Sequence, residues 1–135
     1  MLNDLKFFVY GTLKPEEVNY ERYCAGKVVA SQRAIAMGLL FALPMGFPAM
    51  IPGDQPVHGF LLTFSDPTIL PTFDQLEGYR GGDRPERVNL YNRIQIEVFQ
   101  SDGLSLGLAW AYLMTLEQVQ QFGGELLQDG CWTSI

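Results

Sequence analysis

The 135-residue chain has the size and composition of a single globular domain over residues 1–135, with 47% hydrophobic and 18% charged residues. Its net charge of −6 and its dispersed Lys and Arg residues argue against nucleic acid as a partner. No apolar stretch approaches the roughly 20 residues that a membrane-spanning helix requires, so a membrane is not an expected partner either.

The first predicted element is a short buried strand over residues 7–10, which ends abruptly at Gly11. Pro15, followed by two acidic residues, predicts the first turn of a short helix over residues 15–24. The chain is therefore expected to leave the strand through a tight glycine turn and to enter a helix.

Apolar and β-branched residues predict two strands over residues 27–36 and 39–43. The glycine and prolines of residues 45–52 predict an irregular segment, and residues 57–64 predict a further strand. After this strand, Asp66 and Pro67 supply a helix cap and a proline near the first position, and apolar residues follow at helical spacing. Proline is unfavourable inside a helix, so Pro71 favours a start closer to residue 71.

Clean alternation predicts a half-buried strand over residues 90–98. Residues 104–112 alternate bulky with small side chains, which is typical of a tightly curved sheet or barrel. Thr115 and Gln118 form a capping box for a last short helix that ends at Gly123. Strands outnumber helices and several connections are short, so the sequence predicts an α+β fold with a mixed, largely antiparallel sheet.

Two segments carry candidate chemistry. A strand that ends in Tyr10, Gly11, Thr12 and Leu13 exposes backbone N–H groups that can hold a carboxylate or a developing oxyanion. Glu77 lies in the last turn of its predicted helix, where Gly78 supplies a left-handed cap. The negative helix end, and enclosure by neighbours such as Tyr79, would raise the pKa of Glu77 and suit it to act as a general base.

Together these segments resemble the γ-glutamylcyclotransferase-like family, γ-glutamylamine cyclotransferases included. That family has an early Tyr-Gly-Ser-Leu strand end, a central Val-x-Gly strand, a helix ending in Leu-Asp-x-x-Glu-Gly, and a Tyr-x-Arg strand. The matching segments here span about residues 7 to 113 and are Tyr10-Gly11-Thr12-Leu13, Val57-His58-Gly59, Phe73-Asp74-Gln75-Leu76-Glu77-Gly78 and Tyr91-Asn92-Arg93. Thr12 replaces the usual serine and Phe73 the usual leucine, and both keep the chemistry of the position.

The resemblance implies a small β-barrel with flanking short helices and a reaction without metal or organic cofactor. In it, the α-amine of a γ-glutamyl amine or γ-glutamyl amino acid attacks its own γ-carbonyl and releases 5-oxoproline and the free amine. Mapped by motif, Glu77 moves the proton and Tyr10 lines the pocket. The N–H groups of Gly11, Thr12 and Leu13 hold substrate oxygens.

Other residues in or near these motifs allow either a structural role or a role at the pocket. Tyr91 and Arg93 share one strand face and could reach the substrate carboxylate, but pairing of Arg93 with an acid such as Glu97 is the favoured interpretation. Gly59 indicates close approach of either a ligand or a backbone. The charged loop from Arg80 to Arg87 could border the pocket mouth.

Two alternatives compete with the cyclotransferase. One is a binding module that uses the same pocket without turnover. The other is an amidase that pairs His58 with Cys24 or Cys131, although these cysteines lie outside any Cys-x-x-Cys pattern and are predicted to be free thiols.

Free thiols and the lack of a secretory signal predict a cytoplasmic protein. Bulky residues among Met45, Phe47 and Met50 could mark an interface, so the expected state is a monomer or weak homodimer.

Overall fold

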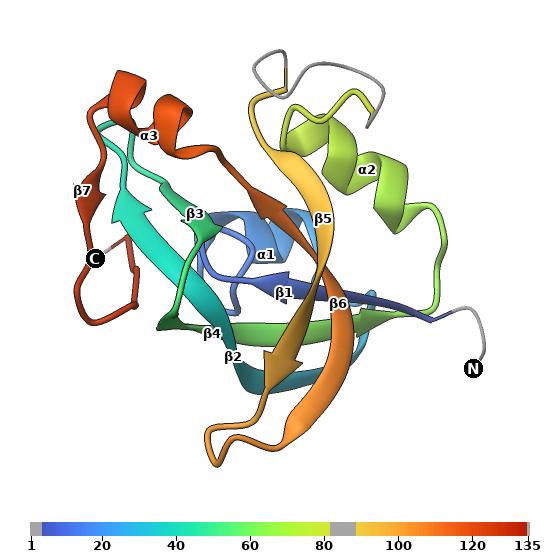
Figure 1. Ribbon diagram of the computed structural model, residues 1–135. Coiled ribbons are helices and arrows are strands. Elements are labelled where there is room, and N and C mark those ends of the chain that lie inside the picture. The colour runs from blue at the N-terminus through green and yellow to red at the C-terminus, as the bar shows by residue number, and fades with distance from the viewer. Residues whose placement is uncertain (1–3, 82–88, 135) are drawn as a thin grey trace.

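Seven strands and three short helices make up the part of the chain that the structure describes, residues 4–81 and 89–134 of a computed structural model (Figure 1). In chain order they are β1 (Leu5–Val9), α1 (Val18–Tyr23), β2 (Val28–Ala42), β3 (Pro48–Pro52), β4 (Gln55–Phe64), α2 (Ile69–Leu76), β5 (Asn92–Phe99), β6 (Ser105–Leu113), α3 (Leu116–Phe122) and β7 (Glu125–Leu126).

Five of the strands form a ring in the order β2, β4, β1, β6, β5 and back to β2. The pair of β1 and β6 is parallel, and the other described pairs are antiparallel. The return from β5 to β2 pairs Ile35 with Phe99 at one position, so the sheet is ring-like rather than a fully hydrogen-bonded barrel. The predicted α+β class with a mixed, largely antiparallel sheet is confirmed.

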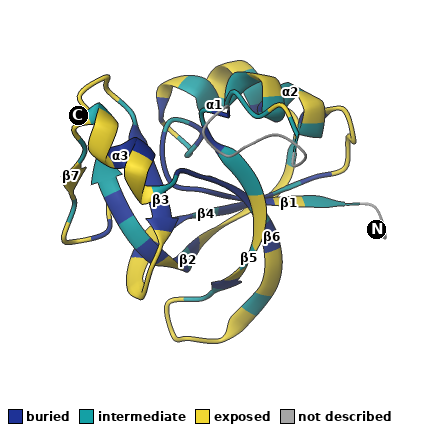
Figure 2. Ribbon diagram, turned by 45° about the horizontal axis from the view of Figure 1, so that its top comes forward, coloured by how far each residue is buried: buried dark blue, intermediate teal, exposed yellow. Residues whose placement is uncertain are grey.

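Small side chains line part of the interior of this ring. Ala34, Ala36, Ala109 and Ala111 are buried together, as the alternation of bulky and small residues in β6 predicted. Figure 2 shows exposed positions along β5 and β6, and buried positions along β3. Close strand approach inside the ring therefore depends on alanine at these positions.

The long strand β2 differs from the prediction of two strands. Gly38 does not end a strand, because there β2 pairs both with Gln55 of β4 and with Pro52 of β3. A Cβ on Gly38 would lie 2.7 Å from the carbonyl oxygen of Ile51, so glycine permits the close approach.

The segment over residues 45–52 was predicted to be irregular, and this is wrong for its second half. Residues 48–51 of β3 are all buried, so no alternation of polar and apolar residues marks the strand in the sequence. Pro48 and Pro52 lie at the two ends of the strand, where proline is tolerated.

Two helix starts also differ from the predictions. The first helix begins at Val18, because residues 11–17 form turns in which Glu16 has φ of 75°. The second begins at Ile69, which places Pro71 in the first turn, where a backbone N–H has no partner inside the helix. The capping box of α3 is confirmed, with Gly123 as its left-handed cap.

The ring requires glycine at residue 59. A Cβ there would lie 2.3 Å from the carbonyl oxygen of Val9 and 2.9 Å from the Phe8 ring. We expect Gly59→Ala to lower the free energy of unfolding by about 1–3 kcal/mol, measured by urea denaturation. His58→Ala, at the exposed neighbouring position, is the control and should change it by less than about 0.5 kcal/mol. Equal midpoints for Gly59→Ala and the parent protein would contradict this account.

Candidate active site

The end of α2 positions Glu77. Phe73 anchors the helix, since its fully buried ring lies 4.9 Å from the Phe7 ring and 5.5 Å from the Phe64 ring. The helix ends at Leu76, and Gly78 has φ of 70°, as the sequence predicted. The Glu77 carbonyl accepts a hydrogen bond from the N–H of Tyr91 at 3.2 Å, which ties this helix end to the approach to β5.

The turn after β1 presents a row of N–H groups. The carbonyl of Gly11 accepts from the N–H of Lys14 at 3.0 Å, and the carbonyl of Thr12 accepts from the N–H of Asn19 at 2.9 Å. Within the described part of the chain, the N–H groups of residues 11–13 donate no hydrogen bond. Lys14 Nζ donates to the carbonyl of Trp132, which holds the turn against the C-terminal segment.

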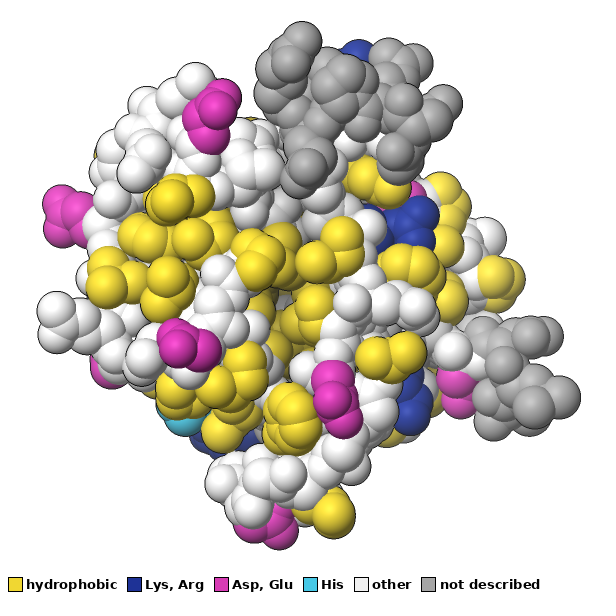
Figure 3. Space-filling model, in the orientation of Figure 1, with side chains coloured by type: hydrophobic (Ala, Val, Ile, Leu, Met, Phe, Trp, Pro, Cys, Tyr) yellow, Lys and Arg dark blue, Asp and Glu magenta, His cyan; other side chains and the backbone are white. Residues whose placement is uncertain are grey.

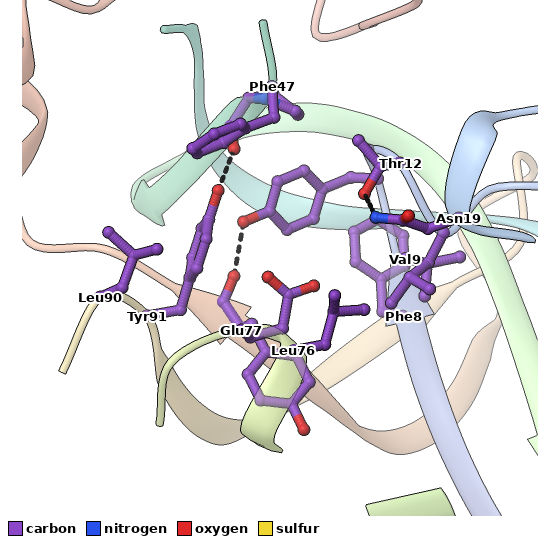
Figure 4. A pocket seen from close by; sticks show the side chains of 14 residues that line it. Phe8, Val9, Thr12, Asn19, Phe47, Leu76, Glu77, Leu90 and Tyr91 are labelled. Carbon is purple, nitrogen blue, oxygen red and sulfur yellow. Dashed lines mark hydrogen bonds between the residues drawn. The ribbon is translucent and has the colours of Figure 1, made fainter. Parts of the chain in front are cut away.

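These two segments meet at one cavity of about 240 Å³. Figure 4 shows the Glu77 carboxylate directed into the space between Tyr91, Leu76 and Thr12. The volume lies below the roughly 300–1,000 Å³ of sites for drug-sized ligands, so it suits a group the size of one amino acid. The lining residues are Phe8, Val9, Tyr10, Gly11, Thr12, Leu13, Asn19, Phe47, Pro48, Leu76, Glu77, Leu90, Tyr91 and Tyr112.

Glu77 has the electrostatic setting of a general base. Its side chain is half-buried and makes no hydrogen bond with a described residue. Burial raises its pKa from the ordinary 4.5 to about 7, because the charged form loses hydration. A carboxyl group with a pKa near neutrality can both accept and return a proton.

Two buried tyrosines beside Glu77 have fixed hydroxyl groups. Tyr10 donates to the carbonyl of Tyr112, and Tyr91 donates to the carbonyl of Pro48 at 2.6 Å. Burial, and the nearby carboxyl of Glu77, raise the pKa of each tyrosine above its ordinary value. Both therefore stay neutral and shape the cavity, and Glu77 is left as the group that can exchange a proton at neutral pH.

The structure separates the residues singled out from the sequence into two groups. Six line the cavity: Tyr10, Gly11, Thr12, Leu13, Glu77 and Tyr91. Gly59, Tyr79 and Arg93 lie outside it. A Cβ on Gly59 would meet the Val9 carbonyl of β1, so close approach of a backbone accounts for this glycine. Tyr79 is not part of the wall of the cavity that Glu77 lines, and its ring lies 5.2 Å from the Arg93 guanidinium instead.

Arg93 forms its ion pair with Asp74 rather than with Glu97, with 2.9 Å between Nε and Oδ1. Asp74 comes from α2, so this pair joins the helix to β5. Glu97 instead accepts a hydrogen bond from Ser105 on β6 at 2.7 Å. Position along the strand explains why Arg93 pairs with Asp74. Arg93 lies at the end of β5 that α2 covers, as Figure 1 shows, and Glu97 lies farther along the strand.

Several residues of the cavity wall were not predicted from the sequence. Phe47 and Pro48 come from the segment predicted to be irregular, and Leu90 precedes β5. Asn19 comes from α1, and its Nδ2 donates to Thr12 Oγ1 at 2.9 Å. A hydroxyl and an amide seven residues apart across a predicted helix start were the available signal for this contact.

None of the described cavities joins a cysteine to the histidine, although the His58 N–H donates to the carbonyl of Gly130, which precedes Cys131, at 2.8 Å. Cys24 is fully buried, and burial raises its pKa to about 12, so it is a poor nucleophile. Cys131 and His58 are exposed, and none of the described cavities is lined by His58 together with a cysteine.

The surface of the described residues bears on the expectations about a membrane, an interface and the charged loop. In Figure 3, hydrophobic side chains gather over the middle of the face, and Lys and Arg side chains are few and separated. No described helix is long and apolar enough to cross a membrane. Of the three residues suggested as an interface, Met50 is buried, Phe47 is half-buried and lines the cavity, and Met45 is 45% exposed. Of the loop predicted from Arg80 to Arg87, residues 82–87 lie outside the described ranges.

Comparisons with known proteins give a family and a fold. Residues 7–134 match the model of the family described as γ-glutamyl cyclotransferase, AIG2-like. A curated relative from Niallia circulans, named γ-L-glutamyl-butirosin B γ-glutamyl cyclotransferase, is 36% identical over 106 residues. That match covers 78% of this chain and 65% of the relative, so the chain spans less than two thirds of that protein.

Solved structures share the fold. An AIG2-like protein from Mus musculus has a TM-score of 0.69 and 22% identity, over 96% of this chain and 88% of that one. YkqA from Bacillus subtilis has a TM-score of 0.65 and 21% identity, over 96% of this chain and 39% of that one. At such identities the similarity establishes the fold alone.

Proposed function

The chain belongs to the AIG2-like γ-glutamyl cyclotransferase family, and on that premise we propose that it is an enzyme that cyclises a γ-glutamyl compound to 5-oxoproline. The observation that carries the proposal is that Glu77 and the amide-lined turn of residues 11–13 share one small cavity. A proton acceptor and a set of N–H donors are the two kinds of group that this reaction needs.

The substrate supplies its own nucleophile. Glu77 takes a proton from the α-ammonium group, and the freed nitrogen attacks the γ-carbonyl carbon, so that a C–N bond forms and the carbonyl oxygen gains negative charge. N–H groups of residues 11–13 stabilise substrate oxygens. The bond to the leaving nitrogen then breaks, and Glu77 passes a proton to that nitrogen. The attacking nitrogen also loses its second proton, which ends on the same leaving amine, so that the amine departs as an ammonium group and the ring keeps one N–H. No water or electron is consumed, and ring closure within one molecule supplies an effective molarity on the order of 10⁵ M or more.

The proposal covers γ-glutamyl amines and γ-glutamyl amino acids alike. The relative from Niallia circulans is named for a γ-L-glutamyl compound, and the γ-glutamyl part is what we extend to this chain. That part carries both reacting groups, the α-amine and the γ-carbonyl, so it must lie beside Glu77 and the turn whatever the leaving group is.

Incubation of the purified protein with both classes of γ-glutamyl compound tests this function. We expect 5-oxoproline and the free amine to appear in equal amounts for at least one compound, measured by liquid chromatography with mass detection. Saturable binding across the set with no 5-oxoproline formed would favour the non-catalytic binding module instead.

The hydroxyl of Thr12 is expected to matter for substrate binding. Its Oγ1 accepts from Asn19 Nδ2 at 2.9 Å and so fixes the turn that carries the N–H donors. Thr12→Val removes the acceptor at nearly constant volume, and loss of about 1 kcal/mol would raise KM about fivefold. Thr12→Ser keeps the hydroxyl and should retain the parent KM in initial-rate measurements. Equal KM values for the two variants would show that this contact does not hold the turn.

A further inference from the structure

Asp74 joins α2 to two strands of the ring at the helix turn that precedes Glu77. Its Oδ1 accepts a hydrogen bond from the Tyr112 hydroxyl of β6 at 2.6 Å. The same oxygen pairs with Arg93 Nε of β5 at 2.9 Å. The side chains of Arg93 and Asp74 are 17% and 20% exposed, so the pair is shielded from much of the solvent. The hydrogen bond from Tyr112 to the carboxylate is charge-assisted and so stronger than one between neutral groups, whereas Arg93 Nε makes no hydrogen bond and contributes an ion pair.

Aromatic rings hold the arginine in this position. The Arg93 guanidinium lies 4.5 Å from the Trp110 ring and 5.2 Å from the Tyr79 ring. Trp110 belongs to β6 and Tyr79 follows the end of α2, so the guanidinium is fixed from both the sheet and the helix side.

The contact of Asp74 leads directly to the cavity. Tyr112 lines the cavity, and its carbonyl accepts a hydrogen bond from the Tyr10 hydroxyl. The Tyr112 ring stacks on the Phe7 ring, with 6.2 Å between centroids. Tyr112 therefore contacts both the helix that leads to Glu77 and Tyr10, the residue that precedes the amide-lined turn.

We propose that Asp74 is a positioning residue, which holds the last turn of α2 against β5 and β6 and thereby keeps Glu77 aimed into a shielded cavity. The inference rests on the proposed function, because it assigns Asp74 a part in placing the base of that reaction. Asp74 does not line the cavity and so acts through Glu77 rather than on the substrate.

The backbone shows how a shift at Asp74 would reach Glu77. The Asp74 carbonyl accepts a hydrogen bond from the N–H of Tyr79 at 2.9 Å, and this bond spans the helix end at which Glu77 lies. If the last turn moves outward, water enters beside the carboxyl group and its pKa falls toward the ordinary value. The titratable groups whose pKa values respond to Glu77 are Tyr10, Tyr91 and Tyr112. Burial raises the pKa of each tyrosine further, so all three stay neutral in this range.

Two substitutions separate position from charge. Asp74→Asn removes the charge facing Arg93, and Tyr112→Phe removes the hydroxyl contact with no change in charge. Asp66→Asn is the matched control. The Asp66 carboxylate accepts hydrogen bonds from Thr68, the residue before α2, and so contacts the opposite end of the same helix. For each protein, kcat and KM are measured well below the melting temperature. The pKa of Glu77 is read by carboxyl NMR titration.

We expect Asp74→Asn and Tyr112→Phe each to lower kcat about tenfold with KM changed less than about twofold, and to lower the pKa of Glu77. Asp66→Asn should change neither. Variants of Asp74 and Tyr112 that melt earlier but keep the parent kcat and Glu77 pKa would overturn the inference. If the parent protein forms no 5-oxoproline, the proposed function fails, and the Glu77 pKa in the variants still decides whether Asp74 positions it.

Discussion

Glu77→Gln is expected to lower kcat by about 100-fold or more, the largest effect of any single substitution considered for this chain. Glutamine keeps the size of the side chain and its place in the cavity but cannot accept a proton. The cavity walls and the amide-lined turn stay in place, so KM should change much less than kcat. Initial rates of 5-oxoproline formation from the best substrate measure both constants.

The same substitution should raise stability above neutral pH. Glu77 has a folded pKa of about 7, above its ordinary 4.5, so it binds a proton more tightly in the folded protein. Its contribution to stability is therefore fully present below about pH 4.5 and is lost as the pH rises through about 7. Glutamine carries no such penalty, so at pH 8 we expect Glu77→Gln to melt at a higher temperature than the parent protein.

Glu21→Gln is the matched control for both measurements, because Glu21 is an exposed glutamate on α1. It should keep the parent kcat and melting temperature. Parent-like turnover in Glu77→Gln would remove Glu77 from the role of base. Loss of turnover together with a lower melting temperature at pH 8 would instead indicate damage to the fold.

Local signals predicted the parts of the site that lie in continuous segments. Gly78 and the helical spacing of Phe73 and Leu76 were enough to place Glu77 at a helix end, since a left-handed cap and a buried helix face both leave marks in the sequence. The turn at Gly11 was equally visible. Both predictions depend on contacts within about ten residues.

Parts of the site that depend on contacts between distant segments were not visible. Phe47 and Pro48 reach the cavity because β3 pairs with the long strand β2, and a strand buried on both faces shows no alternation. The sequence offers several acids as possible partners for Arg93 on its strand. The packing of α2 on the ring determines that Asp74 is the partner. The sequence shows which residue types are present, and the ring closure decides which of them meet.

The second large effect expected is a fall in kcat/KM of about 50-fold between pH 7 and pH 5. A base must be unprotonated to act. Well below a pKa of about 7, the ionised fraction of the carboxyl group falls about tenfold for each pH unit. A glutamate with the ordinary pKa of 4.5 would remain almost fully ionised at pH 6. The ratio of rates at pH 8 and pH 6 therefore distinguishes the two.

The substrate's α-ammonium group adds its own ionisation, so its pKa must be titrated separately and divided out of the profile. The corrected pH dependence of kcat/KM reports the ionisation of the free enzyme. Carboxyl NMR titration of Glu77 should give the same pKa. A corrected profile that is flat from pH 6 to pH 8 would mean that water reaches the carboxyl group. In that case burial by Leu76, Tyr10 and Tyr91 would not tune the base, although Glu77 could still act as one.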